Sequence, residues 1–116
     1  SVLERIKAKS PEQGSFLYDC AQFYINFYSD RFGINGCYFH DASTIAYLLD
    51  PSIFEVELGA VRVACEGIAI GQTIFAPQGV SYPEPHWNDV PMTQVCMEVD
   101  GERMLKLYED VMVGAL

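Results

Sequence analysis

The chain has 116 residues, half of them hydrophobic and 20% charged, which suffices for one small domain with a buried core. Its formal net charge is -9, with seven Lys and Arg residues against sixteen Asp and Glu residues. Nucleic acids and anionic membranes attract clustered positive charge, so we expect neither as a partner. No apolar stretch reaches the roughly 18 to 20 residues that span a bilayer, and no signal-peptide core is present, which predicts a cytoplasmic protein.

The first half of the chain has helical patterning. Apolar residues in "SVLERIKA" are spaced as in a helix, and "KSPEQG" then breaks the pattern with Pro11 and Gly14. From Ser15, "SFLYDCAQFYINFYSDRFG" repeats apolar residues at i, i+3, i+4 and i+7, which predicts an amphipathic helix that ends at Gly33. "ASTIAYLLD" predicts a short third helix that stops before Pro51.

The second half changes character. "IFEVELGAVRVACEGIAIGQTIFA" is rich in Val, Ile and Phe and is interrupted by glycines, which predicts a hairpin or meander of strands. "PQGVSYPEPHWNDVP" predicts a surface turn with one Trp, and "MTQVCMEVD" a further strand. "GERMLKLYEDVMVGAL" predicts a closing helix capped by Asp100, with a buried side of Met104, Leu105, Leu107, Tyr108, Val111 and Met112.

The order of these elements bears on domain organisation. A complete parallel α/β domain alternates strands and helices from its start, whereas this chain places its helices first. We therefore expect it to be the end of a larger domain. Its four cysteines, Cys20, Cys37, Cys65 and Cys96, form no C-x-x-C pair, so we expect reduced, mostly buried thiols. Two disulfides are the alternative in a secreted protein.

His40 and Asp41 stand side by side in "NGCYFHDASTIAYLLDPS", where a glycine-bearing stretch gives way to an apolar run. On one interpretation Asp41 is the N-cap of the short helix and His40 is an ordinary loop residue, since Asp is a preferred N-cap. On the other, the imidazole donates a proton and the carboxylate binds a ligand. The two residues by themselves leave both interpretations open.

Several separated blocks carry a family resemblance: "FYINFYSDRFGINGCYFHD", "TIAYLLDPSIF", "VRVACEGIAIGQT" and "VCMEVDGERMLKLYEDVM". Their order and spacing resemble the C-terminal part of the inosine-uridine preferring nucleoside hydrolases. In that family a helix leads through a Gly-containing loop to His-Asp, a short helix and a strand region. The resemblance implies an α/β fold in which residues 1–116 form the C-terminal segment of a Rossmann-like nucleoside hydrolase domain, with helices, a strand meander and a closing helix.

The resemblance also implies an activity, namely hydrolysis of ribonucleosides to ribose and free base in nucleoside salvage. By position, His40 would protonate the leaving base, and Asp41 would be a ligand of a calcium cofactor. The chemistry suits both residue types, since imidazole donates protons near neutral pH and calcium prefers carboxylate oxygens. The resemblance further implies a homo-oligomer whose partner is its ribonucleoside substrate.

Three more residues are candidates for substrate binding. Tyr24 and Tyr28 lie four apart on one helical face and match, by their offset from His40, family aromatics that close over the base. Plain core packing is the alternative for both. Asn35, in the loop before His40, could touch the substrate.

The sequence also departs from the family pattern. Ala42 stands where the family commonly has Pro after His-Asp, and the family's amino-terminal D-x-D-P-G-x-D-D signature has no counterpart in this chain. One carboxylate cannot supply the roughly six to eight oxygens that calcium takes. We therefore expect the isolated 116 residues to be inactive. The alternative function is a non-catalytic α/β interaction or dimerisation domain, in which His40 and Asp41 only shape a loop.

Overall fold

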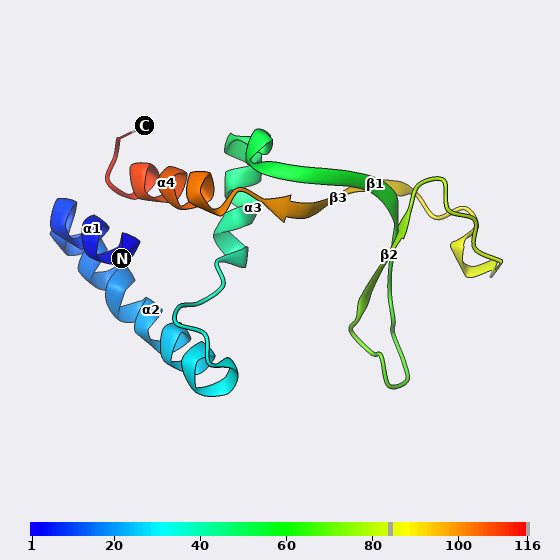
Figure 1. The fold of residues 1–116 in the computed structure, drawn as a ribbon, viewed down its shortest axis with the longest axis horizontal. Coiled ribbons are helices and arrows are strands. Elements are labelled where there is room, and N and C mark those ends of the chain that lie inside the picture. Colours follow the sequence, from blue (N-terminus) through cyan, green and yellow to red (C-terminus); the bar gives the residue numbers. More distant parts are fainter. Residues whose placement is uncertain (84, 116) are drawn as a thin grey trace. The chain divides into compact units, whose positions relative to one another are not determined.

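The computed structural model describes residues 1–83 and 85–115, which form two units (Figure 1). The sequence predictions at residues 84 and 116 lie outside the described residues. The first unit is helical and contains α1 (Val2–Lys9), α2 (Pro11–Phe32), α3 (His40–Leu49), the short 3-10 helix η1 (Pro51–Ile53) and α4 (Gly101–Met112). The second unit contains β1 (Phe54–Val63), β2 (Thr73–Pro77), the short 3-10 helix η2 (Pro85–Trp87) and β3 (Met92–Val99).

The junction between α1 and α2 depends on Gly14. α1 lies beside the first turns of α2, and a Cβ on Gly14 would lie 2.4 Å from the Cα of Lys7 (Figure 1). Only a residue without a side chain fits there. The sequence predicted that α2 starts at Ser15, but it begins at Pro11, because proline is well suited to the first position of a helix. Gly14 is therefore a packing position inside α2 rather than a helix breaker.

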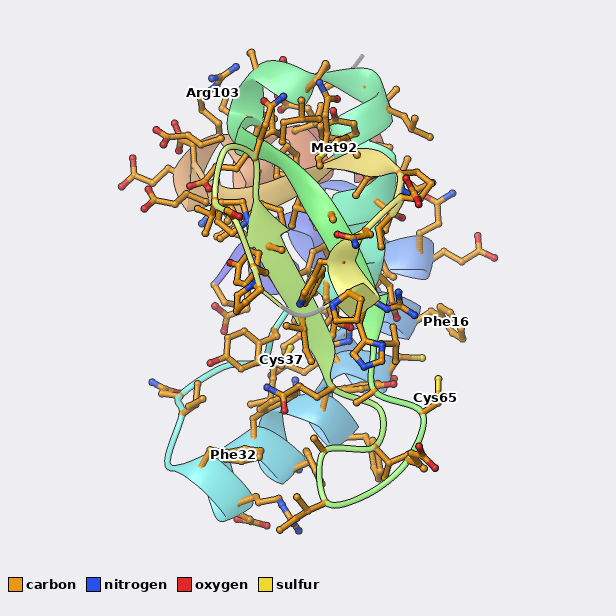
Figure 2. The ribbon with its side chains drawn as sticks, turned by 90° about the vertical axis from the view of Figure 1, so that its right-hand side faces the viewer. Phe16, Phe32, Cys37, Cys65, Met92 and Arg103 are labelled. Atoms are coloured by element: carbon orange, nitrogen blue, oxygen red, sulfur yellow. The ribbon has the colours of Figure 1, made fainter. Side chains whose placement is uncertain are left out.

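The far end of α2 is as predicted, but most of its apolar side chains are exposed. Gly33 ends the helix with a φ of 67°, and its N–H donates to the carbonyl of Ser29. Phe16 and Phe23 are 70% and 73% exposed, and Phe16 projects away from the ribbon (Figure 2). Gly14 is the buried residue of this helix among the described residues. The apolar periodicity thus predicted the helix, while this chain leaves much of the apolar face uncovered.

α4 begins as predicted and buries a different set of residues. The side chain of Asp100 accepts a hydrogen bond from the Arg103 N–H at 3.0 Å, which is an N-cap. Met104 is buried, but Leu105 and Val111 of the predicted buried side are exposed. The buried polar residue is Glu109, because two cations of α1 neutralise its carboxylate.

The second unit is a three-stranded antiparallel sheet of order β2-β1-β3. β1 and β2 form the predicted hairpin, whose connection has Gly67 at φ 74° and Gly71 at φ 85°. The closing strand β3 pairs with β1 and not with β2, so β1 is the central strand. The turn between β2 and β3 is pinned by its Trp as expected, because the ring centroids of Trp87 and Tyr82 are 5.5 Å apart.

The cysteines contradict one expectation. All four are free thiols, but Cys20, Cys65 and Cys96 are exposed and Cys37 is half-buried, so the prediction of mostly buried thiols is wrong. The reason is that Cys20 lies on the uncovered part of α2. Cys65 lies in the hairpin connection (Figure 2). Within residues 1–83 and 85–115, no helix is long and apolar enough to cross a membrane.

Candidate functional site

His40 and Asp41 lie in the first turn of α3, directly after the loop of residues 33–39. The side chains are 64% and 97% exposed, and His40 Nε2 lies 3.9 Å from Asp41 Oδ1. The N-cap position belongs to Phe39, which makes no side-chain cap hydrogen bond. The predicted capping role of Asp41 is therefore wrong, because the helix starts before Asp41 and places its carboxylate beyond the cap position.

The first turn of α3 is stabilised without using either site side chain. The Ser43 hydroxyl donates to the carbonyl of His40, and the Thr44 hydroxyl donates to the carbonyl of Asp41 at 2.8 Å. Both hydrogen bonds engage backbone oxygens. The imidazole and the carboxylate consequently project from a well-formed helical turn, where they can meet a ligand.

An open cavity of about 360 Å³ lies in front of this turn, within the helical unit. Its walls come from α2, the loop of residues 33–39, α3 and α4. We call it the His40 groove; the residues that define it include Leu17, Tyr24, Phe39, His40, Asp41, Tyr108 and Met112. Most of this lining is apolar or aromatic, with an imidazole and a carboxylate at one side. Such a lining suits a flat, partly apolar ligand that needs one or two polar contacts.

The structure brings together three of the five residues that the sequence singled out. Tyr24, His40 and Asp41 all line the groove. Tyr28 instead packs in an aromatic cluster, with its ring centroid 5.2 Å from that of Tyr38, and Asn35 is an exposed loop residue; neither is part of the groove lining. The substrate-binding roles of Tyr24, Tyr28 and Asn35 stay predictions.

Sequence reasoning missed several residues of the groove. Phe39 and Cys37 precede His40 in the chain, and Tyr108 comes from α4, far away in sequence. Tyr108 was assigned only to the buried side of its helix. No signal in the sequence shows that one edge of α4 faces the start of α3, because that juxtaposition depends on how the helices pack.

The described residues do not form a calcium shell. Within residues 1–83 and 85–115, no group of three or more His, Cys, Asp or Glu side chains could hold a metal ion. Calcium takes roughly six to eight oxygen ligands, and Asp41 is the one carboxylate that lines the groove in the described part of the chain. At this place the described residues therefore offer a single carboxylate, which is too few oxygen ligands for a complete calcium site.

Solved structures define the class of protein to which this fold belongs. A plant nucleoside hydrolase, PpNRh1, superposes with a TM-score of 0.86 at 30% identity, over 97% of this chain and 36% of that one. A purine-preferring ribonucleoside hydrolase from Gardnerella vaginalis superposes with a TM-score of 0.77 at 25% identity, over 97% and 34% of the two chains. The fold is thus a part of the α/β fold of nucleoside hydrolases.

Sequence comparison gives the particular family. The sequence profile of the inosine-uridine preferring nucleoside hydrolases matches residues 1–106, and the chain belongs to this family. Curated relatives include probable uridine nucleosidase 1 of Oryza sativa subsp. japonica, 26% identical over 97% of this chain and 35% of that protein. Another is uridine nucleosidase 1 of Arabidopsis thaliana, 31% identical over 60% of this chain and 19% of that protein. The chain spans about a third or less of these relatives.

Proposed function

We propose that residues 1–116 are the C-terminal part of a larger nucleoside hydrolase domain, and that the full-length protein hydrolyses ribonucleosides. The observation that carries this proposal is the His40 groove, in which an exposed imidazole stands beside aromatic and apolar walls in a chain of this family. The name of the family and those of its uridine nucleosidase relatives make uridine and inosine the first substrates to test.

In the proposed reaction, water adds its oxygen to C1′ of the ribose while the C1′–N bond breaks. The electron pair of that bond goes to the base nitrogen, and the sugar passes through an oxocarbenium-like state. His40 donates a proton to the departing base, because an unprotonated nitrogen anion is a poor leaving group. The products are ribose and free base. The attacking water loses one proton to solvent and His40 regains one from solvent, so the reaction balances.

Substrate binding in this proposal uses the wall of the groove. The ring of Tyr24, which lines the cavity, stacks on or caps the base. Tyr28 packs against Tyr38 and so supports the loop that leads to His40, and Asn35 contacts the substrate only if that loop closes over it. Replacing Tyr24 with Ala should therefore raise KM by about 2- to 10-fold, which corresponds to the free energy that one aromatic contact contributes to binding.

The cofactor belongs to the proposal as well. We assign Asp41 as one calcium ligand of the full-length protein, with the other oxygens supplied from outside this chain. Its exposed carboxylate, which makes no cap hydrogen bond, supports this role. The family resemblance further supports a cytoplasmic homo-oligomer that acts in nucleoside salvage, and an inactive isolated segment.

The test of this proposal is a comparison of two leaving groups in the full-length protein. His40→Ala should lower kcat on uridine or inosine by about 10²- to 10⁴-fold, the usual share of general acid catalysis. A nitrophenyl riboside, whose leaving group needs no proton, should be cleaved almost as fast as by the wild type. Equal losses on both kinds of substrate would reject the proton donor. Wild-type protein without activity on any nucleoside would favour the non-catalytic interaction domain.

A further inference from the structure

Tyr108 contacts the residue that directly precedes His40. The ring centroids of Phe39 and Tyr108 are 4.3 Å apart, and the ring planes are at 81°, which is an edge-to-face arrangement. Aromatic pairs of this geometry contribute specific orientation as well as buried area. Phe39 is half-buried by this packing, although it stands at the exposed start of α3.

The entry of the chain into α3 is held by such ring contacts and not by a cap. The N-terminus of α3 has no side-chain cap hydrogen bond, so its orientation depends on other interactions. Tyr38 packs on Tyr28 of α2, whereas Phe39 packs on Tyr108 of α4. Two consecutive aromatic residues thus attach the end of the loop to two different helices, and His40 is the next residue.

The helix that carries Tyr108 is itself firmly placed within the helical unit. At its start, Arg103 donates to the Asp50 carboxylate at 2.9 Å and to the Ser52 hydroxyl at 2.7 Å. Beside Tyr108, the Glu109 carboxylate forms ion pairs with Arg5 and Lys9 of α1. The Tyr108 phenol has an ordinary pKa of 10.0, which burial raises further, so the side chain is neutral near pH 7.

We propose that Tyr108 is a positioning residue for His40, which it orients through the ring of Phe39 at the mouth of the His40 groove. The inference rests on the proposed function, because it assigns Tyr108 a part in proton donation. Removal of the ring releases Phe39 and lets the first turn of α3 shift. A displacement of about 1 Å suffices to lower the rate of a positioned group by about 10²-fold.

The experiment uses the full-length protein with uridine and a nitrophenyl riboside. Tyr108→Leu should lower kcat on uridine by about 10- to 100-fold and change kcat on the nitrophenyl riboside by less than about threefold. Tyr108→Phe keeps the ring and should restore both rates. The matched control is Tyr82→Leu, which removes one ring of the Tyr82–Trp87 pair in the other unit and should affect neither substrate selectively.

A second variant tests whether Tyr108 acts on His40 through the ring of Phe39. Phe39→Leu should reproduce the selective loss of kcat on uridine. The double variant Phe39→Leu with Tyr108→Leu should lose no more kcat than either single variant, because both substitutions remove the same ring contact. Equal losses on both substrates, failure of Tyr108→Phe to restore the rate, or additive losses would overturn the inference. If Tyr108→Leu does not fold, Phe39→Leu decides alone; failure of both to fold would also overturn it, in favour of a purely structural contact.

His40→Ala, measured alongside, separates this inference from the proposed function. A non-selective loss in His40→Ala rejects the general acid and with it the basis of the inference. A selective loss in His40→Ala without a selective loss in Tyr108→Leu rejects the positioning role and leaves the proposed function intact.

Discussion

The guanidinium Nε of Arg5 lies 2.8 Å from a carboxylate oxygen of Glu109, and this ion pair joins α1 to α4. The other carboxylate oxygen lies 2.8 Å from Lys9 Nζ. Glu109 is buried, where a carboxylate without a partner would be costly. Its negative charge therefore depends on the two ion pairs with Arg5 and Lys9. The first and last helices of the chain are therefore connected through one acidic side chain next to Tyr108.

This arrangement predicts a pH dependence of stability. The hydrogen bonds from Lys9 and then Arg5 hold the pKa of Glu109 below its ordinary value of 4.5. A depressed folded pKa stabilises the protein above the unfolded pKa, and this stabilisation is lost as the pH falls through the folded pKa. Glu109→Gln should thus lower the thermal midpoint by several degrees at pH 7, and the difference from wild type should shrink as the pH falls below 4.5.

The control for this prediction is the neighbouring residue. Asp110 pairs with Lys106 at 2.7 Å on the exposed side of the same helix, and such i, i+4 pairs contribute little. Asp110→Asn should leave the thermal midpoint almost unchanged, both at pH 7 and below pH 4.5. An equal effect of the two substitutions in thermal unfolding would contradict the role assigned to Glu109.

Gly14 gives a prediction about packing. In Gly14→Ala, the new methyl group would lie 2.4 Å from the Cα of Lys7, and that atom belongs to the backbone of α1 and cannot rotate away. We expect a loss of about 1–3 kcal/mol in the free energy of unfolding, the usual cost of overpacking. Chemical denaturation of the full-length protein measures it.

Gly101→Ala is the matched control, because a Cβ on Gly101 would meet no atom within 4 Å at the start of α4. Alanine favours a helix over glycine, so this variant should be as stable as wild type or slightly more stable. If Gly14→Ala left the free energy of unfolding unchanged, α1 would be able to move away from α2 without a loss of stability.

Asp41 gives a prediction that separates metal binding from helix stability. Because its carboxylate caps nothing and is 97% exposed, Asp41→Asn should leave the thermal midpoint in chelator close to that of wild type. As a ligand of a hard cation it loses a full charge, so calcium affinity in the full-length protein should fall by about 10-fold or more. Titration calorimetry with calcium measures the affinity.

Asp30→Asn, an exposed acid in α2, is the control and should keep the calcium affinity of wild type. Retained affinity in Asp41→Asn would remove Asp41 from the metal site.

The exposed apolar side chains predict the behaviour of the 116 residues produced alone. Phe16, Phe23 and Leu48 are exposed at 70%, 73% and 77%, and apolar patches of several hundred Å² are rarely left bare. The isolated chain should self-associate, bind a hydrophobic dye and cleave no nucleoside. Phe16→Lys with Phe23→Lys should reduce the association in analytical ultracentrifugation. A monomer at all concentrations without dye binding would contradict this expectation.

The sequence by itself determined the local structure of this protein. Capping and punctuation are short-range effects, so Asp100 predicted the start of α4, Gly33 the end of α2, and the glycines of "GIAIGQT" the bend of the hairpin. The spacing of apolar residues predicted the helices and the strands, because this pattern also depends on residues that are close together in the sequence. The separated blocks of the family pattern were also readable, because they depend on residue identity and spacing.

Tertiary structure decided which of these residues meet. Pro11 and Gly14 look like helix breakers in the sequence, yet both belong to α2. Pro11 suits the first position of a helix, and the close approach of α1 leaves no room for a side chain at Gly14. Likewise, the N-cap interpretation of Asp41 failed because α3 begins at His40 with Phe39 at the cap position, and Phe39 packs on Tyr108 of α4. Two aromatic residues from distant parts of the chain come together only through helix packing, which no local pattern encodes.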